Sequence, residues 1–438
     1  MTKGAQESPP RAGFGPLAAV WRAVGGAAAA LARPTLALLE RSGDPRAAAL
    51  AERLALDDLA DSVPRGCLWL HGASVGEIRA LKPLAAALAA ARPDLPILVT
   101  ATTRAGRERA AAELPGRARL APLDAVAPLR RFLDAAAPRL HVVVETEIWP
   151  TRLALLARRG VPAAIVSARL SPERAARYSR LGGLYGPCLR SLALLAPASA
   201  DDRVRLLAAG ADEARLGPVE NLKWDAAPAP PADGAKAALA AELGANAART
   251  WIVLGSAHPG EAAPLVAATR AALGPAADGV GWLVAPRHPD RFAAEAESLA
   301  AILGPLWPAS RGPAPNGAAA LLLDKIGLLP RIYPLAAAAL LGGTFAPVGG
   351  HTPLEAAVAG CPLVAGPHVQ HQLDLLAPLV AAGGVMPAAS FAEAGAQLAR
   401  WVAAPDEARA AGAAIQAEVA LRRGVAGRLA AVLAGLAR

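Results

Sequence analysis

GGTFAPVGGHTPLE, at residues 342–355, follows an apolar run at residues 335–341 and ends in a proline, a leucine and a glutamate. The run predicts a buried strand. Pro353 suits the first turn of a helix because its fixed φ and its missing N–H are tolerated there. The stretch therefore predicts a glycine-rich turn that joins a strand to a helix beginning near Thr352.

This turn has the features of an anion-binding site. Gly349 and Gly350 permit close approach of a ligand to the backbone, and free N–H groups at a helix start favour a negative charge. Glu355, one turn into the helix, is placed to accept hydrogen bonds from sugar hydroxyls. A phosphate beside a polyol indicates a nucleotide-type ligand. The alternative is that the glycines only allow tight packing of the turn.

Short apolar runs alternate with helical segments on both sides of a proline-rich break at residues 226–235. The runs before the break are 67–71, 96–101, 140–145, 163–167 and 192–199, with helical segments that include 76–91 and 103–113. The runs after it are 251–256, 279–286, 319–324, 335–343 and 361–366. Such alternation predicts βαβ units around parallel sheets, so the fold class is α/β with two Rossmann-like domains.

The predicted organisation follows from this division. We expect an N-terminal membrane-associating segment, a first Rossmann-like domain, a linker, a second Rossmann-like domain and a C-terminal helix that packs back on the first domain. Their ranges are 1–40, 41–225, 226–235, 236–420 and 421–438. The glycine- and proline-rich stretch 304–317 is predicted as a surface loop.

Composition narrows the class of protein. With 438 residues, 54% hydrophobic and 18% charged, the chain has the size for two cores and is not disordered. A net charge of +9 indicates an anionic partner. Aromatic residues make up 4% of the chain, and it has neither a basic tract interleaved with aromatics nor the spacing of a zinc finger. We therefore expect an anionic membrane surface and no nucleic acid.

Cys67, Cys188 and Cys361 lie far apart, in no metal-binding or disulfide spacing, so a reducing compartment fits best. The segment 14–39 is apolar, but arginines, glycines and a proline interrupt it. A membrane span needs about 20 mostly apolar residues. We predict an interfacial helix with Trp21, Arg22 and Arg33 near the headgroups; a helix packed on its own domain is the alternative.

Polar residues follow the predicted strands, where ligands bind in open α/β sheets. In the first half, Glu77 lies at a helix start and is either a general base or a helix-terminal glutamate that interacts with the dipole. Glu145 and Glu147 are two residues apart and are expected to point to opposite sides; we prefer Glu147 for the site, and its neighbour for pairing with an arginine.

In the second half, Ser256 and His258 follow one strand, and Arg287 and His288 follow the next. Arginine is a natural bidentate ligand for phosphate. For each histidine the alternative is a structural hydrogen bond, which is the role we predict for His141.

Seven of these motifs together resemble the ordered motif set of the 3-deoxy-D-manno-octulosonic acid (Kdo) transferases, glycosyltransferase family 30, over about residues 40–430. They are HGASVGE (71–77), ETEIWP (145–150), ARLS (168–171), NLKWD (221–225), SAHPGE (256–261), PRHPDR (286–291) and GGTFAPVGGHTPLE (342–355). The resemblance implies a GT-B fold, with two facing Rossmann-like domains and an interdomain cleft. It also implies transfer of Kdo from CMP-Kdo to a lipid A precursor by a peripheral or monotopic protein on the cytoplasmic face of the inner membrane.

By the same resemblance, Glu77 is the catalytic base, Glu147 and Lys223 support the reaction centre, Pro286 and Arg287 contact CMP, and Glu355 closes on the nucleotide. The predicted catalytic residues are Glu77, Glu147 and Lys223, and the predicted donor-binding residues are Ser256, His258, Pro286, Arg287, His288, Gly349, Gly350, His351, Thr352 and Glu355. Neither a metal nor a cofactor is expected, because no DxD or clustered His/Asp motif is present.

The chain departs from the family pattern at Ser167, Glu220, Thr352 and His371. In addition, DKIGLL (324–329) replaces a DTMGEL-like motif and has Leu328 where the family has glutamate. These departures concern recognition of the donor more than the fold or the base. We expect weaker CMP binding than in the family norm.

Three other functions are compatible with parts of this pattern. A GT-B transferase or epimerase that uses another nucleotide sugar is distinguished by binding UDP rather than CMP. A catalytically silent relative that binds lipid or protein is disfavoured because Glu77, Lys223, Arg287 and Glu355 are all present. A hydrolase that uses Ser74 or Ser256 lacks the G-x-S-x-G elbow, and no Walker A motif supports ATP hydrolysis.

Overall fold

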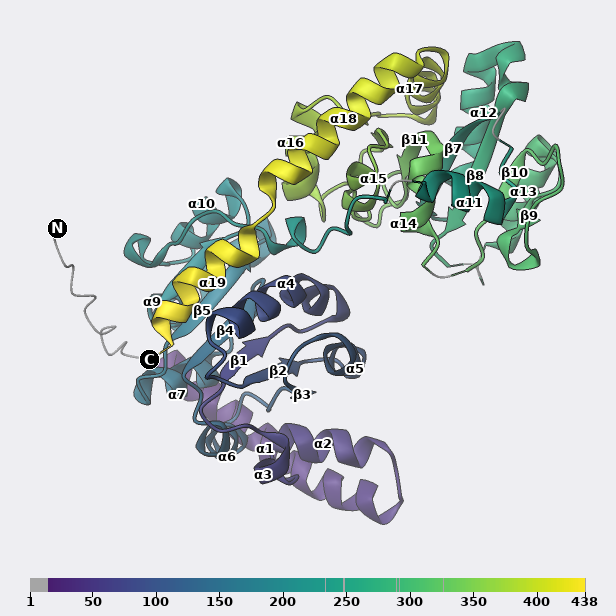
Figure 1. Ribbon diagram of the computed structural model, residues 1–438. Coiled ribbons are helices and arrows are strands. Elements are labelled where there is room, and N and C mark those ends of the chain that lie inside the picture. The colour runs from purple at the N-terminus through teal and green to yellow at the C-terminus, as the bar shows by residue number, and fades with distance from the viewer. Residues whose placement is uncertain are drawn as a thin grey trace. The chain divides into compact units, whose positions relative to one another are not determined.

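The computed structural model describes residues 15–437 except 233, 247–248, 289, 291 and 326. It divides into two compact units (Figure 1). The first contains the described residues up to Ala226 and those from Gly424 onward, and the second extends from Ala227 to Arg423. Each unit has one parallel sheet with helices packed around it. The predicted α/β class with two Rossmann-like domains is thus confirmed.

The sheet of the first unit has the strand order β3-β2-β1-β4-β5-β6, with every pair parallel. Its strands are β1 (Leu68–His71), β2 (Ile97–Ala101), β3 (Arg117–Leu120), β4 (Leu140–Val144), β5 (Ala163–Ala168) and β6 (Leu194–Pro197). Successive strands extend outward on opposite sides of β1 and β4. In sheets of this kind ligands bind where the strand order reverses, so the residues after β1 and β4 occupy the expected position for a site.

The helices of this unit follow the strands in the manner of βαβ crossovers. They are α1 (Pro16–Arg41), α2 (Arg46–Leu54), α3 (Leu59–Ser62), α4 (Val75–Ala91), α5 (Arg104–Glu113), α6 (Val126–Ala136), α7 (Pro150–Arg158), α8 (Pro172–Arg180), α9 (Gly182–Arg190), α10 (Ala200–Ala208) and α19 (Val425–Leu436), with short 3₁₀ turns at Glu213–Arg215 and Leu222–Trp224. The C-terminal α19 packs beside α4 (Figure 1).

The second unit has the strand order β13-β12-β11-β7-β8-β10-β9. Its strands are β7 (Thr250–Ala257), β8 (Val280–Pro286), β9 (Trp307–Pro308), β10 (Ala320–Leu322), β11 (Ala336–Leu341), β12 (Leu363–Ala365) and β13 (Val385–Pro387). Its α-helices are α11 (Ala235–Leu243), α12 (Ala262–Leu273), α13 (Ala293–Leu303), α14 (Leu329–Ile332), α15 (Leu354–Val358), α16 (Leu373–Ala381), α17 (Phe391–Ala403) and α18 (Pro405–Arg422), and its 3₁₀ turns include Gly274–Gly279 and Tyr333–Leu335. Here the order reverses between β7 and β11.

Three strands were not predicted from the sequence. The four residues of β3 include two arginines, and β13 has three residues. The two-residue β9 lies inside the stretch 304–317, which was predicted as a loop. All three lie at or beside a sheet edge, where one neighbour is enough and a long apolar run is not required.

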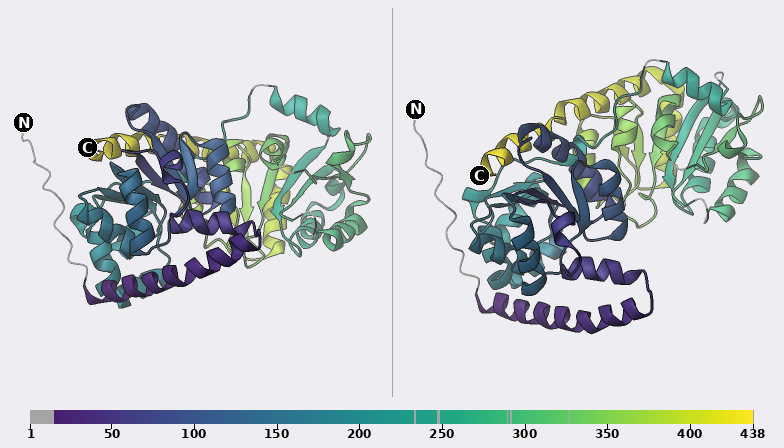
Figure 2. Two further views of the ribbon diagram at one scale, coloured as in Figure 1. Left: turned by 90° about the horizontal axis from the view of Figure 1, so that it is seen from below. Right: turned by 60° about the horizontal axis from the view of Figure 1, so that its bottom comes forward.

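The predicted N-terminal helix is present as α1, although residues 1–14 lie outside the described part of the chain. It runs along the outside of the first unit (Figure 2) and packs against α2, α6, α7 and α9. Trp21 is half-buried and donates from Nε1 to Asp124 Oδ2 at 2.7 Å, so part of its ring contacts its own domain. None of the described helices combines the length and apolarity of a membrane span.

Candidate active site

Two clusters of polar side chains lie at the two points where strand order reverses, one in each unit. The first gathers around the carboxyl ends of β1, β4 and β5, and the second around those of β7, β8 and β11.

Glu77 lies in the first turn of α4 and forms a reciprocal capping box with Ser74. Its Oε2 accepts the backbone N–H groups of Ala73 and Ser74. Burial, followed by the negative charge of Glu145, raises the pKa of Glu77 to about 7, although the two N–H groups act in the opposite direction. A capping carboxylate on a solvated helix would keep its ordinary pKa, so this environment gives Glu77 a property that capping does not require.

Glu145, directly after β4, pairs with Lys223. Its Oε1 lies 2.9 Å from Lys223 Nζ and 3.9 Å from Arg169 Nη1. Glu145 has φ of +61°, a left-handed conformation that is unusual for glutamate. This turn in the backbone breaks the strand alternation from which the sequence prediction placed Glu145 and Glu147 on opposite sides. Observed strain of this kind is frequent at functional sites.

The segment that carries Lys223 is held by β5 and by α19. Ser167, with φ of +51° at the end of β5, donates from Oγ to the Glu220 carbonyl and accepts the Leu222 N–H at 2.8 Å. From α19, Arg428 pairs with the Glu220 carboxylate at 2.6 Å. Two of the departures from the family pattern, Ser167 and Glu220, therefore take part in holding the lysine segment.

Glu147 is part of a hydrogen-bonded network that reaches into the core through His71 and Thr100. Thr100 Oγ1 accepts from Trp69 Nε1 and lies 2.8 Å from His71 Nδ1. An ionised carboxylate only accepts, so His71 Nε2 carries the ring proton and donates to Glu147 Oε2 at 2.9 Å, which leaves Nδ1 of the neutral ring to accept from Thr100 Oγ1. The same oxygen accepts from Trp149 Nε1 at 3.0 Å.

The surroundings of Glu77 and Glu147 shift the pKa values of these two carboxyl groups in opposite directions. Burial, together with the charge of Arg152, lowers the pKa of His71 to about 4, so the ring is neutral at pH 7. Burial alone would raise the pKa of Glu147, but its hydrogen bonds from His71 and Trp149 hold it at about 2. Glu147 is thus a fixed anion, whereas Glu77 exchanges its proton near neutral pH.

In the second unit, the glycine-rich stretch differs from the expectation in two respects. The helix α15 begins at Leu354, two residues later than expected, and is only five residues long, so its dipole is small. Gly349 and Gly350 have φ of +91° and +81°, and a Cβ on Gly349 would lie 2.4 Å from the His371 ring. Turn geometry and packing therefore account for both glycines.

The N–H groups at the start of this stretch already have an anion as partner. Glu261, buried with 1% exposure, accepts from Gly343 at 2.8 Å, from Phe345 at 2.9 Å and from Ala346 at 3.0 Å. It also accepts from the His258 N–H at 2.8 Å. Sequence reasoning missed Glu261, although it ends the quoted SAHPGE motif.

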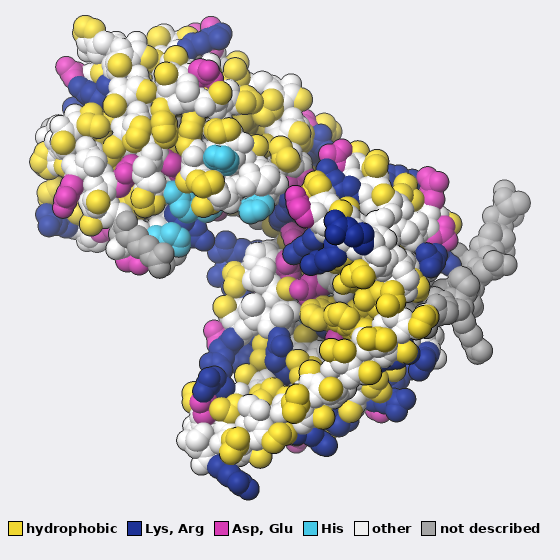
Figure 3. Space-filling model, turned by 180° about the vertical axis from the view of Figure 1, so that it is seen from behind, with side chains coloured by type: hydrophobic (Ala, Val, Ile, Leu, Met, Phe, Trp, Pro, Cys, Tyr) yellow, Lys and Arg dark blue, Asp and Glu magenta, His cyan; other side chains and the backbone are white. Residues whose placement is uncertain are grey.

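Histidines meet beside this loop. His258 Nε2 and His351 Nε2 are 2.9 Å apart with nearly parallel rings, and the His288 ring centroid is 6.0 Å from that of His258. Burial, then the positive charges of His258 and Arg287, lowers the pKa of His351 to about 4. Figure 3 shows histidine side chains gathered on the surface of this unit. The three imidazole rings therefore lie close together, with the Arg287 guanidinium near enough to affect the pKa of His351.

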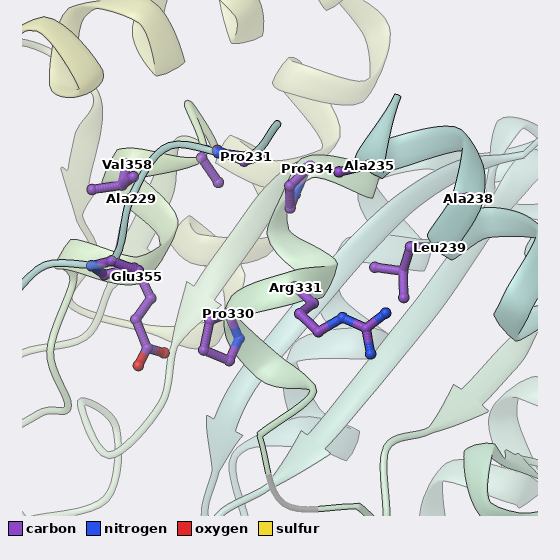
Figure 4. Close-up of a pocket in the computed structure, with 12 residues that line it drawn as sticks. Ala229, Pro231, Ala235, Ala238, Leu239, Pro330, Arg331, Pro334, Glu355 and Val358 are labelled. Atoms are coloured by element: carbon purple, nitrogen blue, oxygen red, sulfur yellow. The ribbon is translucent and has the colours of Figure 1, made fainter. Parts of the chain in front are cut away.

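Glu355 is placed differently from the histidines. It lines a cavity of about 310 Å³ formed by the linker, α11, α14 and α15, where it and Arg331 flank Pro330 (Figure 4). Among the predicted donor residues, the described lining of this cavity includes Glu355 alone. Leu328, which replaces the family glutamate, is buried at the start of α14.

The remaining predicted residues lie near these groups. Ser256, next to the last residue of β7, has φ of +55°. Pro286 ends β8, and Thr352 Oγ1 accepts the Leu354 N–H. His141 is buried and donates from Nδ1 to the Trp69 carbonyl, in agreement with a structural role. Among the described residues, no group of three or more His, Cys, Asp or Glu side chains is arranged to hold a metal ion.

The chain is similar in sequence to known proteins. A family described as 3-deoxy-D-manno-octulosonic-acid transferase (kdotransferase) matches residues 48–226. The 3-deoxy-D-manno-octulosonic acid transferase of Bordetella pertussis is 34% identical over 331 residues, which cover 73% of this chain and 75% of that relative. The transferase of the same name from Haemophilus influenzae is 30% identical over 356 residues, covering 79% and 81%.

The fold of the chain is similar to that of solved structures. A glycosyltransferase from Rickettsia africae matches with a TM-score of 0.58 at 8% identity, covering 85% of this chain and 98% of that one. At this identity the likeness concerns the fold alone, and it confirms the predicted GT-B class.

Proposed function

The chain belongs to the Kdo transferase family of glycosyltransferases, and we propose that it transfers Kdo from CMP-Kdo to a lipid A precursor with inversion at the anomeric carbon. An inverting transfer requires a base for the acceptor hydroxyl and stabilisation of the leaving phosphate. The observation that carries the proposal is Glu77, a carboxyl group with a pKa of about 7 beside the Glu145–Lys223 pair.

Glu77 is the base in this mechanism. A base works best when its pKa lies near the working pH, and general-base catalysis contributes about 10²- to 10⁴-fold. Glu147 accepts hydrogen bonds from His71 and Trp149, which keep it ionised, so it gives the cluster a fixed negative charge. Lys223 contributes a positive charge that Glu145 holds in place at 2.9 Å.

Donor binding is assigned to the second unit. Arg287 binds the CMP phosphate, the neutral His258 and His351 supply hydrogen bonds, and Glu355 accepts from the ribose. The nearness of Arg287 to the histidines, seen in its effect on their pKa values, supports this grouping. The short α15 and the loop N–H groups taken by Glu261 leave the phosphate to side chains.

Arg287→Ala tests the donor assignment. We expect CMP binding to weaken by about 1.5 to 3 kcal/mol, the contribution of a hydrogen bond to a charged group. Titration calorimetry with CMP measures this change. Unchanged affinity would remove Arg287 from the site.

The acceptor is assigned to the first unit, which we propose to bind peripherally to the cytoplasmic face of the inner membrane. A groove of about 700 Å³ between α1, α2 and α6 has an apolar lining with Arg33, Arg130 and Arg131 at its walls. These charges complement an anionic lipid. On α1, exposed apolar side chains extend along the helix, as Figure 3 shows for one face of the unit.

One assay tests the whole proposal. Purified protein is incubated with CMP-Kdo and a tetra-acylated lipid A precursor, and the products are identified by mass. We expect a product heavier by Kdo, formed at least about 10²-fold more slowly by the Glu77→Gln variant. Product formation from a UDP-sugar, with none from CMP-Kdo, would instead support a transferase with another donor.

A further inference from the structure

Glu261 connects two segments that are far apart in the chain. One oxygen, Oε2, accepts the N–H groups of His258 and Gly343, both at 2.8 Å. The other, Oε1, accepts those of Phe345 at 2.9 Å and Ala346 at 3.0 Å. A carboxylate has about four acceptor sites, so two oxygens with two donors each leave it fully used.

These bonds lead directly to the histidine pair. The Gly343 carbonyl accepts the Gly350 N–H at 2.8 Å, and the Gly342 carbonyl accepts the His351 N–H at 3.2 Å. Glu261 thus fixes the backbone of His258 on one side, and through the loop it fixes the backbone of His351 on the other. The contact of 2.9 Å between the two rings depends on both.

We propose that Glu261 is a positioning residue for donor binding, whose carboxylate takes the place of a bound anion at the glycine-rich loop and holds His258 against His351. The inference rests on the proposed function, because it is the donor that those histidines face. It also explains why a loop with the appearance of a phosphate-binding turn is not free to bind phosphate through its first N–H groups.

Glu261→Gln is the test variant. The amide NH₂ group replaces one oxygen, so two backbone N–H groups lose their acceptor and face a donor. We expect the CMP dissociation constant to rise at least tenfold and the NMR resonances of His258 and His351 to shift, both measured below the variant's melting temperature. Wild-type affinity together with unshifted histidine resonances would overturn the proposal.

Glu295 offers a matched control. It is 9% exposed and accepts the N–H groups of Gly260 and Ala263, both at 2.9 Å, without a described bond to the glycine-rich loop. Glu295→Gln is expected to lower the melting temperature while CMP affinity stays within twofold of wild type. If both variants weaken CMP equally, loss of stability explains the effect and the proposal fails.

A double variant tests the route of the effect. If Glu261 acts through the histidine pair, Glu261→Gln combined with His351→Ala binds CMP little worse than His351→Ala alone. Multiplication of the two losses would contradict that route. Should the glutamine variant not fold, Glu261→Asp keeps both oxygens on a shorter side chain and is expected to weaken CMP at least threefold; unchanged affinity and resonances in a folded Asp variant would equally overturn the proposal.

Failure of the proposed function is recognised separately. If the wild-type protein does not bind CMP, the donor assignment is wrong. The histidine resonances of the ligand-free variants still report whether Glu261 holds the pair, and unshifted resonances would then refute the positioning role.

Discussion

Glu77 combines two tasks that make different demands on a carboxyl group. Its Oε2 caps α4 through Ala73 and Ser74, which stabilises the helix in either protonation state of the other oxygen. Its burial beside Glu145 raises the pKa to about 7, which matters for proton transfer and not for capping. A substitution that keeps the hydrogen-bonding shape but removes the acid–base function therefore separates the two.

Glu77→Gln is that substitution. The amide oxygen still accepts the capping N–H groups, so we expect the free energy of unfolding to change by less than about 1 kcal/mol. Turnover is expected to fall about 10²-fold or more because the base is lost, while CMP affinity stays the same. Melting temperature, calorimetry and transfer rate on one preparation decide the matter. Near wild-type turnover would remove the role of base from Glu77.

The pH dependence of kcat/KM is a second test of this carboxyl group. Because a base acts in its deprotonated form, the rate should rise with pH and level off above the Glu77 pKa of about 7. Glu145→Gln removes a neighbouring negative charge, which lowers that pKa and moves the acid limb to lower pH. Glu113→Gln, which removes a half-buried partner of Arg109 and Lys82, is the control and should leave the limb in place. An acid limb that Glu145→Gln does not move would show that another group titrates.

For single residues, the sequence predicted the placement of side chains that depends on position along a helix or strand. It did not predict placement that depends on an unusual local backbone conformation. Glu77 follows from its place after a strand, at the start of a helix. The pairing of Lys223 with Glu145 depends on φ of +61° at Glu145, which no alternation rule predicts. The role of Glu261 depends on contacts with residues 343–346, more than eighty positions away in the chain.

Among the elements, long apolar runs and alanine-rich helices were predicted within a few residues, because burial in a parallel sheet requires continuous apolar sequence. The strands β3, β9 and β13 were missed because edge strands lack that signature. Strand order cannot be predicted from any single apolar run, although it is the strand order that brings the residues after β1 and β4 together. The late start and short length of α15 reflect the glycine turns before it, with φ of +91° and +81° at Gly349 and Gly350.

The helix α19 has a role beyond closing the chain. Asp225, two residues after Lys223, accepts the N–H groups of Gly424 at 2.7 Å and Ala426 at 2.6 Å, and thereby caps α19. Arg428 of α19 pairs with Glu220 on the other side of the lysine. The C-terminal helix therefore clamps the short segment that carries Lys223 at both ends.

Asp225→Ala is expected to lower the free energy of unfolding by about 1 kcal/mol, as for loss of a helix cap, and to reduce turnover because Lys223 loses its fixed position. Asp212→Ala, which removes the cap of the short turn Glu213–Arg215, is the matched control and should affect stability alone. Chemical denaturation and the transfer assay measure the two effects. Equal turnover in the two variants would reduce α19 to a purely stabilising element.

For the whole molecule, the proposed membrane contact rests on two features, the net charge and one face of α1. The chain carries a net charge of +9, which draws it to anionic surfaces at low ionic strength. On α1, the exposed apolar residues are Leu17, Val20, Val24, Leu31 and Leu38. Spacings of three, four and seven residues place them along one side of the helix. The opposite side packs on the domain through Ala18, Ala29 and Leu36, so deleting the helix would expose core residues as well as remove the proposed membrane-binding face.

Substitution within this apolar stripe is therefore the sharper experiment. Val24 and Leu31 are 64% and 72% exposed, so Val24→Asn with Leu31→Gln leaves the core intact and should barely change the melting temperature. Each loses about 1 to 2 kcal/mol of apolar transfer into the interface, so binding to vesicles rich in anionic phospholipid should weaken at least tenfold in flotation assays. Val204→Asn on α10, with 66% exposure, is the matched control and should bind like wild type.

Activity on detergent-dispersed acceptor should survive in both variants, because the site after β1 and β4 is untouched. If the stripe variant still floats with the vesicles as wild type does, α1 is not the membrane anchor, and its exposed face has some other use.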